Sequence, residues 1–216
     1  MGLLPIEIAV DIPNEDRMQI ARDIKAQRDK WAHISEYPIY ADETNTPMYY
    51  IGSPVYPCQS NKSLYTKKHL DSINTLQHIT KYLQPVILEA LSKHYNLPIE
   101  HLPNASIPGF HIFNNVGKDS EVIIPSFHMD IDILQLFPEV FKGEIVSFVY
   151  IVETSNNGDR LDYDGGILEY EENKLYLWSA NLLHKIGDVY LETPEDYRIT
   201  YQGHCIILEG KIYYYW

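Results

Sequence analysis

Apolar and polar positions follow different rhythms in the two halves of this chain. In the first half, apolar residues recur at helical spacing over about 15–32 and again over about 66–95. Asn14 stands where a helix N-cap is expected. Pro85 interrupts the second stretch, so we expect a kink there or the start of another helix.

From about residue 106 the rhythm changes to that of strands, with β-branched and aromatic residues separated by turns rich in Gly, Asn and Asp. Eight short strands in one unit favour a sandwich or jelly roll. We expect a single domain, 1–216, in which residues 1–105 form a helical and loop-like support and residues 106–216 the β core. The candidate strands are 107–113, 121–127, 144–152, 166–170, 174–178, 186–191, 198–208 and 211–215.

Residues 34–62 are loop-like and rich in proline, with 48–51 as a short strand candidate. Residues 4–12 are typical of a strand or extended arm that ends at Pro13. The tyrosines of the loop-like stretch either line a substrate pocket or, as is more usual, pack loops onto the core. They are Tyr37, Tyr40, Tyr49, Tyr50 and Tyr56.

Composition narrows the choice of function. The net charge of −13 argues against a nucleic-acid-binding surface and is compatible with a cationic substrate or partner. Two cysteines, Cys58 and Cys205, are too few for a disulfide framework and fit a reducing cytoplasm. No apolar run is long enough to cross a membrane, and residues 1–10 lack the basic leader of a signal peptide. The oligomeric state stays open.

The candidate chemistry begins at His128-x-Asp130, which follows a strand-like stretch. Residues two apart on a strand point to the same face, so the imidazole and the carboxylate can aim at a common point. Two histidines and one carboxylate form the ligand set of non-haem iron oxygenases. This short pattern also occurs by chance as a surface pair. Asp132, on the same face, offers an alternative carboxylate.

Two features later in the chain make a metal site at His128-x-Asp130 a stronger hypothesis. His184 lies between two strand candidates, far enough along the chain for a histidine of a distant strand to meet His128. Arg198 and Thr200 share one face of a further strand. A buried arginine needs an anionic partner, which is either an internal acid or a carboxylate cosubstrate.

In this order, the motifs resemble the Fe(II)/2-oxoglutarate-dependent dioxygenases, especially the prolyl-hydroxylase-like branch. The resemblance covers roughly residues 106–210, and the first half of the chain carries no motif of that family. It includes an aromatic residue, Trp178, six positions before the distal histidine. The motifs are His128-x-Asp130, Asp164-Gly-Gly-Ile-Leu-Glu-Tyr170, Leu175-Tyr-Leu-Trp-Ser-Ala-Asn-Leu-Leu-His184 and Arg198-Ile-Thr-Tyr-Gln-Gly-His204.

The resemblance implies a double-stranded β-helix, a cupin-like jelly roll supported by N-terminal helices. It implies Fe(II) held by His128, Asp130 and His184, with 2-oxoglutarate bound by Arg198 and Thr200. It further implies that O2 hydroxylates an amino-acid side chain, free or in a peptide, or a small metabolite, while 2-oxoglutarate is decarboxylated to succinate and CO2. An intact Asp130 favours hydroxylation over halogenation.

Three further residues have open roles under this resemblance. His111 and Asn114 either contact the cosubstrate or are satisfied polar groups of the core. Asp132 either orients a metal ligand or contacts the substrate. In this superfamily the substrate is set by loops and by the N-terminal extension, so the sequence leaves its identity open.

Two other functions compete with the oxygenase. The first is a cupin-like metal protein with hydrolase or isomerase chemistry, in which Arg198 pairs with an internal acid and 2-oxoglutarate does not bind. The second is a non-enzymatic jelly-roll binding module, in which His128 and His184 lie far apart. The distances between these side chains in the folded protein distinguish the three functions.

Overall fold

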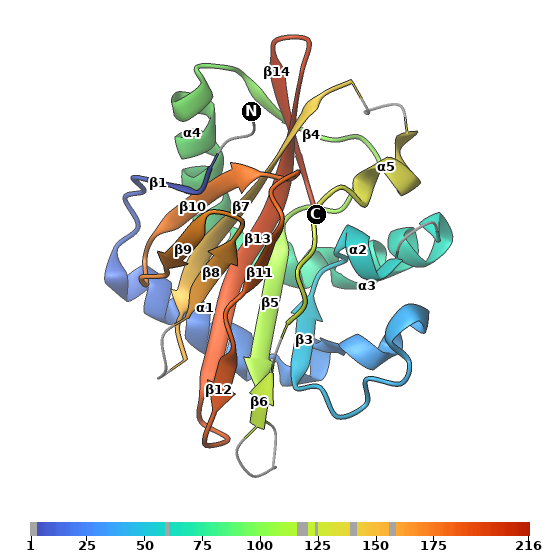
Figure 1. Cartoon of the computed structure of the whole chain (residues 1–216), viewed down its shortest axis with the longest axis vertical. Helices are drawn as coiled ribbons and strands as arrows, with labels where there is room; N and C mark the ends of the chain where they lie inside the picture. Colours follow the sequence, from blue (N-terminus) through green and yellow to red (C-terminus); the bar gives the residue numbers. More distant parts are fainter. Residues whose placement is uncertain (1–3, 59–60, 116–120, 124, 139–141, 156–158) are drawn as a thin grey trace.

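A nine-stranded, mostly antiparallel sheet runs through the centre of the molecule (Figure 1). The computed structural model describes residues 4–58, 61–115, 121–123, 125–138, 142–155 and 159–216. The strand order is β1-β10-β7-β13-β5-β3-β2, and β14 pairs with β13 and, in parallel, with β4. The strands are β1 (Ile6–Ile8), β2 (Ala32–His33), β3 (Met48–Ile51), β4 (Ile99–His101), β5 (Gly109–Asn114), β7 (Glu144–Glu153), β10 (Leu175–Ser179), β13 (Tyr197–Leu208) and β14 (Lys211–Tyr215).

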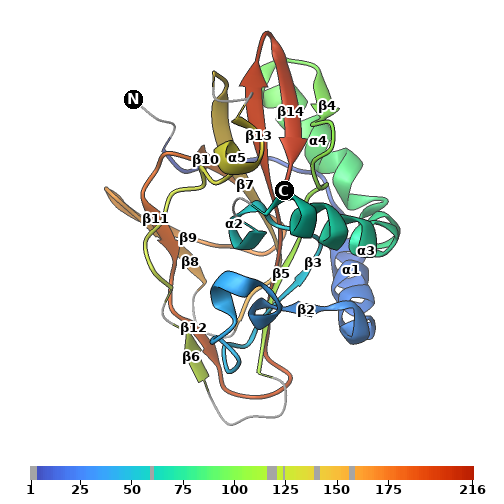
Figure 2. The ribbon, with the colours of Figure 1, turned by 90° about the vertical axis from the view of Figure 1, so that its right-hand side faces the viewer.

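Two smaller antiparallel sheets lie opposite one face of the large sheet (Figure 2). One has the order β11-β8-β9 and the other pairs β12 with β6. The predicted fold, mainly β with a jelly-roll arrangement and supporting helices, is confirmed by these facing layers. The additional strands are β6 (Glu121–Ile123), β8 (Arg160–Tyr163), β9 (Gly166–Glu169), β11 (His184–Ile186) and β12 (Val189–Leu191).

Helices cover the other face of the large sheet (Figure 2). They are α1 (Asn14–Ala26), α3 (Lys62–Thr80) and α4 (Leu83–Tyr95). Pro85 lies in the first turn of α4, so the expected second helix is present. The first helix is shorter than predicted, because the chain leaves it after Ala26 and Trp31 folds back to donate from Nε1 to the Ile24 carbonyl over 3.1 Å.

The loop-like stretch contains short turns of helix beside strand β3. A further short helix follows the His128-x-Asp130 segment. No helix of the described residues is both long enough and apolar enough to cross a membrane. These short elements are η1 (Arg28–Lys30), η2 (Ile34–Glu36), η3 (Pro38–Tyr40), α2 (Val55–Cys58) and α5 (Ile133–Leu136).

Several strand predictions need correction, and the short strands β2 and β4 were not predicted. Strand β8 was missed, because the Asp and Gly residues of 162–166 predicted only a turn. The expected strand 186–191 is two strands, β11 and β12, that belong to different small sheets. The expected strand 121–127 ends at Ile123, and Pro125, which has no N–H to donate, follows soon after.

Side chains of β13 alternate between the two faces of the large sheet. Ile199 and Tyr201 belong to the core that packs against the helices. The residues between and beside them, such as Arg198, Thr200 and His204, therefore face the small sheets. Apolar packing on one face thus fixes polar side chains toward the space between the layers.

Candidate metal centre

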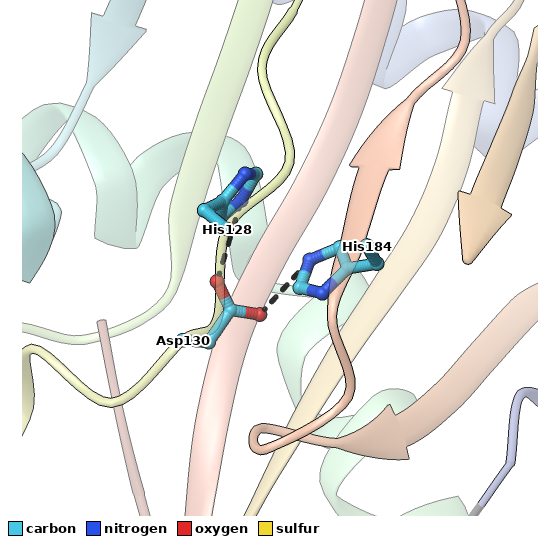
Figure 3. A group of neighbouring side chains, drawn as sticks. All are labelled: His128, Asp130 and His184. Atoms are coloured by element: carbon cyan, nitrogen blue, oxygen red, sulfur yellow. Dashed lines mark ion pairs between the residues drawn. The ribbon is translucent and has the colours of Figure 1, made fainter. Parts of the chain in front are cut away.

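His128, Asp130 and His184 converge between the layers (Figure 3). His184 begins β11, while His128 pairs with it through an isolated antiparallel bridge, with N–O distances of 2.8 and 3.0 Å. The Asp130 N–H donates to the Ala180 carbonyl over 2.9 Å. The sequence predicted a regular strand at His128 and Asp130. This is wrong, because Pro125 precedes the segment, and the described residues show an isolated bridge at His128 in place of a continuous ladder.

The three side chains are close enough to share one ion. One ligand atom from each lies within 4.8 Å of the others. Asp130 Oδ1 is 3.7 Å from His128 Nε2, and Oδ2 is 3.4 Å from His184 Nε2. The two imidazole centroids are 4.6 Å apart. The binding-module hypothesis required distant histidines and is wrong on that point.

Backbone carbonyls fix the tautomer of both histidines. His128 Nδ1 lies 3.0 Å from the Ser126 carbonyl, and His184 Nδ1 lies 2.8 Å from the Leu182 carbonyl. A carbonyl only accepts, so each Nδ1 carries the hydrogen and each Nε2 keeps its lone pair toward Asp130. Burial lowers the pKa of His184, which keeps this imidazole neutral. Two neutral nitrogens and one carboxylate fit Fe(II).

Asp130 is held from behind by the large sheet. The Ser147 hydroxyl donates to Asp130 Oδ2 over 2.5 Å and lies 3.1 Å from His204 Nδ1. Ser147 and His204 are directly opposite each other on β7 and β13. Burial acts to raise the pKa of Asp130, but the neighbouring imidazoles and this hydroxyl hold it below its ordinary value. The carboxylate therefore stays ionised and fixed in orientation.

The triad opens into a cavity of about 510 Å³. Its walls come from the large sheet, from the small sheets and from the N-terminal loops. Of the tyrosines proposed for a pocket, Tyr40 and Tyr56 line it. Tyr37 and Tyr50 are fully buried outside the lining, and Tyr49 packs against Trp31 instead. The loops therefore have both of the predicted roles.

Arg198 is buried beside this cavity, with a side chain that is 1% exposed. Its Nε lies 3.4 Å from Asp159 Oδ2. Its two Nη atoms have no hydrogen-bond partner among the described residues. The guanidinium lies 5.4 Å from the ring of Phe113 and 5.8 Å from that of Tyr170, and both rings line the cavity. Buried donors of this kind are normally satisfied, so the two Nη atoms are suited to bind an anionic group.

The other predicted cosubstrate residues have different surroundings. Thr200 is buried, and its hydroxyl accepts from Gln202 Nε2 over 2.7 Å. His111 lines the cavity with its Nε2 unpartnered among the described residues. Burial, reinforced by Arg198, lowers the pKa of His111 far below its ordinary value, so the imidazole is neutral.

Asn114 is not brought to the cavity. Its amide accepts from Arg28 and donates to the carbonyls of Pro194 and Asp196, so it holds the start of β13 in place. Asp132 does line the cavity but stands outside the triad. Its Oδ1 accepts from Gln135 Nε2 over 3.1 Å. Asp130, rather than Asp132, therefore faces both histidines.

Sequence reasoning missed four residues of the site. Ser147 interrupts the apolar run of β7, which is a signal that could have been used. Tyr170 ends the Asp164–Tyr170 motif, and its buried hydroxyl has no partner among the described residues. His204 stood at the end of a motif but received no role. Asp159 had no signal, because it meets Arg198 only through the fold.

Comparisons with known proteins give structural neighbours only. No family model and no curated protein matches the sequence. A prolyl hydroxylase from Trichoplax adhaerens, in complex with a hypoxia inducible factor oxygen degradation domain peptide fragment, is similar at 12% identity and a TM-score of 0.48, covering 92% of this chain and 82% of that one.

An N-substituted L-amino acid dioxygenase from Burkholderia ambifaria is also similar. In complex with alpha-KG it aligns at 9% identity and a TM-score of 0.44, covering 100% of this chain and 99% of that one. A second structure of it has 9% identity, a TM-score of 0.45 and the same coverage.

Proposed function

We propose that this chain is an Fe(II)- and 2-oxoglutarate-dependent oxygenase that hydroxylates an amino-acid side chain, free or in a peptide, or a small metabolite. One observation carries the proposal. A complete His-Asp-His donor set lines the cavity, and Arg198 lies behind two of its wall residues, Phe113 and Tyr170, with two Nη atoms that have no partner among the described residues. The first requires a cation and the second an anion. The keto acid 2-oxoglutarate satisfies both, since one end chelates iron and the other is a carboxylate.

His128, Asp130 and His184 would hold the iron from one side and leave its remaining positions toward the cavity. Ser147 would keep the Asp130 carboxylate in place. When bound, iron and 2-oxoglutarate supply the oxidising chemistry, in which O2 is consumed and succinate and CO2 are released. The contribution of the chain is to position these groups and to keep water away from them.

The distal carboxylate of 2-oxoglutarate would bind Arg198. The guanidinium presents its Nη edge as a fork, because the Nε edge faces Asp159. The Tyr170 hydroxyl is buried, unpartnered among the described residues and under the influence of both Arg198 and Asp130. This hydroxyl is therefore suited to bind the cosubstrate between the two ends of the site. The walls around it are largely aromatic and aliphatic, which favours a dry cavity.

An anaerobic titration tests the proposal. Fe(II) and then 2-oxoglutarate are added to the metal-free protein, and the weak visible charge-transfer band of keto-acid chelation is recorded. Wild type should show the band. His128→Ala and His184→Ala should abolish it, and Arg198→Ala should require at least about tenfold more 2-oxoglutarate. His78→Ala, exposed on α3, is the matched control and should behave as wild type.

The cupin-like metal protein keeps one observation in its favour, since Arg198 does have an internal acid, Asp159, near its Nε. The same titration separates the two functions. Tight metal binding without the band would support hydrolase or isomerase chemistry at the triad and would overturn the oxygenase. A succinate-release screen with candidate amino acids and peptides would follow a positive band.

A further inference from the structure

We propose that the cavity holds an acidic subsite, formed by Asp132, Glu43 and the ring of Tyr40, that binds a positively charged group of the substrate, either an ammonium or a guanidinium. This inference rests on the proposed function, because it concerns the substrate of that same site. It adds a chemical class to a substrate that the triad alone leaves open.

The charges that line the cavity are one-sided. Among the described residues, no lysine or arginine lines it, whereas Glu43, Asp130 and Asp132 do. Asp130 belongs to the triad, and its charge together with those of Fe(II), Arg198 and 2-oxoglutarate cancels. Glu43 and Asp132 remain as two negative charges that neither metal nor cosubstrate neutralises.

Neither carboxylate has a cationic partner in the described chain. Asp132 accepts from the neutral Gln135 amide over 3.1 Å, and Glu43 accepts from the neutral Thr46 hydroxyl over 2.6 Å. Several other acids of the molecule do pair with lysines, for example Glu153 with Lys25.

Tyr40 joins the two acids. It lines the same cavity as both carboxylates, and the Glu43 N–H donates to the Tyr40 carbonyl over 2.9 Å. The Tyr40 ring is 6.3 Å from that of Tyr56. Carboxylates beside aromatic rings are the surroundings that attract ammonium and guanidinium groups.

A second, independent observation points to a ligand in this cavity. His111 is 8% exposed, lines the same cavity and has an Nε2 without a partner among the described residues. Its ring is 5.8 Å from that of Tyr56. A buried polar atom of this kind is normally hydrogen-bonded, so we expect His111 Nε2 to bond to a polar group of a bound molecule. The wall from Tyr40 through Tyr56 to His111 thus carries hydrogen-bonding and charge-binding groups along one side.

The position of Asp132 adds a constraint on the substrate. It is two residues from Asp130, so their Cα atoms lie within ~8 Å. A cation held at Asp132 is therefore close to the triad. The carbon that reacts then lies only a few bonds from the charged group, as it does in a basic amino-acid side chain.

Matched probes test the inference. N-acetyl-L-lysine methylamide is compared with its norleucine counterpart, which has the same four side-chain carbons and a hydrogen atom in place of the ammonium. N-acetyl-L-arginine methylamide is compared with its citrulline counterpart. Binding to the anaerobic protein loaded with Fe(II) and 2-oxoglutarate is measured by calorimetry, after the charge-transfer band of each sample has been recorded. Free L-lysine, run alongside, distinguishes an amino acid from a peptide as the source of the cation.

At least one cationic probe should bind about 10- to 100-fold more tightly than its neutral counterpart. Asp132→Asn and Glu43→Gln should each remove most of that preference. Asp42→Asn makes the same charge change in the same loop but does not line the cavity, so it should keep the preference.

Equal binding of cationic and neutral probes by wild type overturns the inference, as does failure of both cationic probes to bind at millimolar concentration. This comparison needs no variant, so a misfolded variant cannot obscure it. A sample that lacks the charge-transfer band shows failure of the proposed function instead. The two failures are therefore distinguishable.

Discussion

Asp159 approaches Arg198 from the Nε edge of the guanidinium, with 3.4 Å between Oδ2 and Nε and with both side chains 1% exposed. Ser155 fixes the carboxylate, since its N–H and its hydroxyl donate to the two oxygens over 3.1 and 2.7 Å. The arginine is thereby oriented before any ligand arrives, and its two Nη atoms have no hydrogen-bond partner among the described residues. The loop that precedes β8 thus determines how the site presents its positive charge.

Replacing Asp159 by alanine should destabilise the fold strongly. Arg198 would remain buried without a counter-charge, which typically costs about 3–5 kcal/mol of unfolding free energy. Urea denaturation of the metal-free protein measures this. Asp164→Ala, in an exposed turn of the same region, is the control and should leave the urea midpoint close to wild type. A similar midpoint for both variants would contradict the buried pair.

Ser147→Ala should weaken metal binding without unfolding the protein. The variant removes the 2.5 Å hydrogen bond that orients Asp130, and loss of such a bond typically costs 10- to 100-fold in metal affinity, so we expect a loss of about that size. Anaerobic titration with Co(II), followed by the visible absorption of the bound ion, measures this affinity. Ser179→Ala removes a buried hydroxyl of β10 that is not hydrogen-bonded to the triad and serves as control. Equal affinities of the two variants would show that Ser147 has no part in positioning the carboxylate.

Acid should destabilise the metal-free fold below about pH 6.5. Burial lowers the pKa of His111 and His204 in the folded state, so the unfolded state binds more protons between that lowered pKa and the ordinary value. Stability therefore falls as pH falls through this window, by up to about 1.4 kcal/mol per pH unit for each histidine. Urea denaturation between pH 8 and pH 5 measures the slope. His111→Gln should flatten it, with His78→Gln as control, and an unchanged slope would argue against a buried neutral His111.

Gly109→Ala should disturb the floor of the cavity. An added Cβ would stand 2.2 Å from the Trp216 ring and 2.4 Å from the Ile51 carbonyl, and the backbone atom has little room to yield. We expect a loss of about 1–3 kcal/mol, together with a shift in tryptophan fluorescence, because Trp216 lines the cavity. Gly166→Ala, whose Cβ would meet only the mobile end of Tyr163, should change neither. Wild-type stability in Gly109→Ala would show that the ring is not seated there.

The sequence was informative where function depends on residue type. The grouping of His128, Asp130 and His184 and the burial of Arg198 were predictable, because few side chains suit an iron site or a carboxylate partner. Helical and strand periodicity likewise predicted the helices and most strands. Those signals are local, and they reflect which face of an element is buried.

The rest depended on long-range pairing that no local pattern encodes. The His128 segment is irregular because it bridges to His184, more than fifty positions away, and not because of its own propensity. Asp159 becomes a partner of Arg198 only through the fold. In the sequence, Asn114 and His111 had the same possible roles. In the structure, the Asn114 amide donates to two backbone carbonyls, whereas the His111 ring lines the cavity.

Strand β13 has a consequence for the order in which the site opens. It pairs with β5, β7 and β14, so its amide protons are expected to be among the slowest in the molecule to exchange with solvent. The segment around His128 is held by the isolated bridge to His184 and by the bonds that Asp130 accepts from Ser147 and donates to Ala180, so we expect it to open at a lower free energy than β13. If the triad holds iron as proposed, local opening of this segment would release the metal while Arg198 stays in position, and the metal-free chain would be reloaded without refolding.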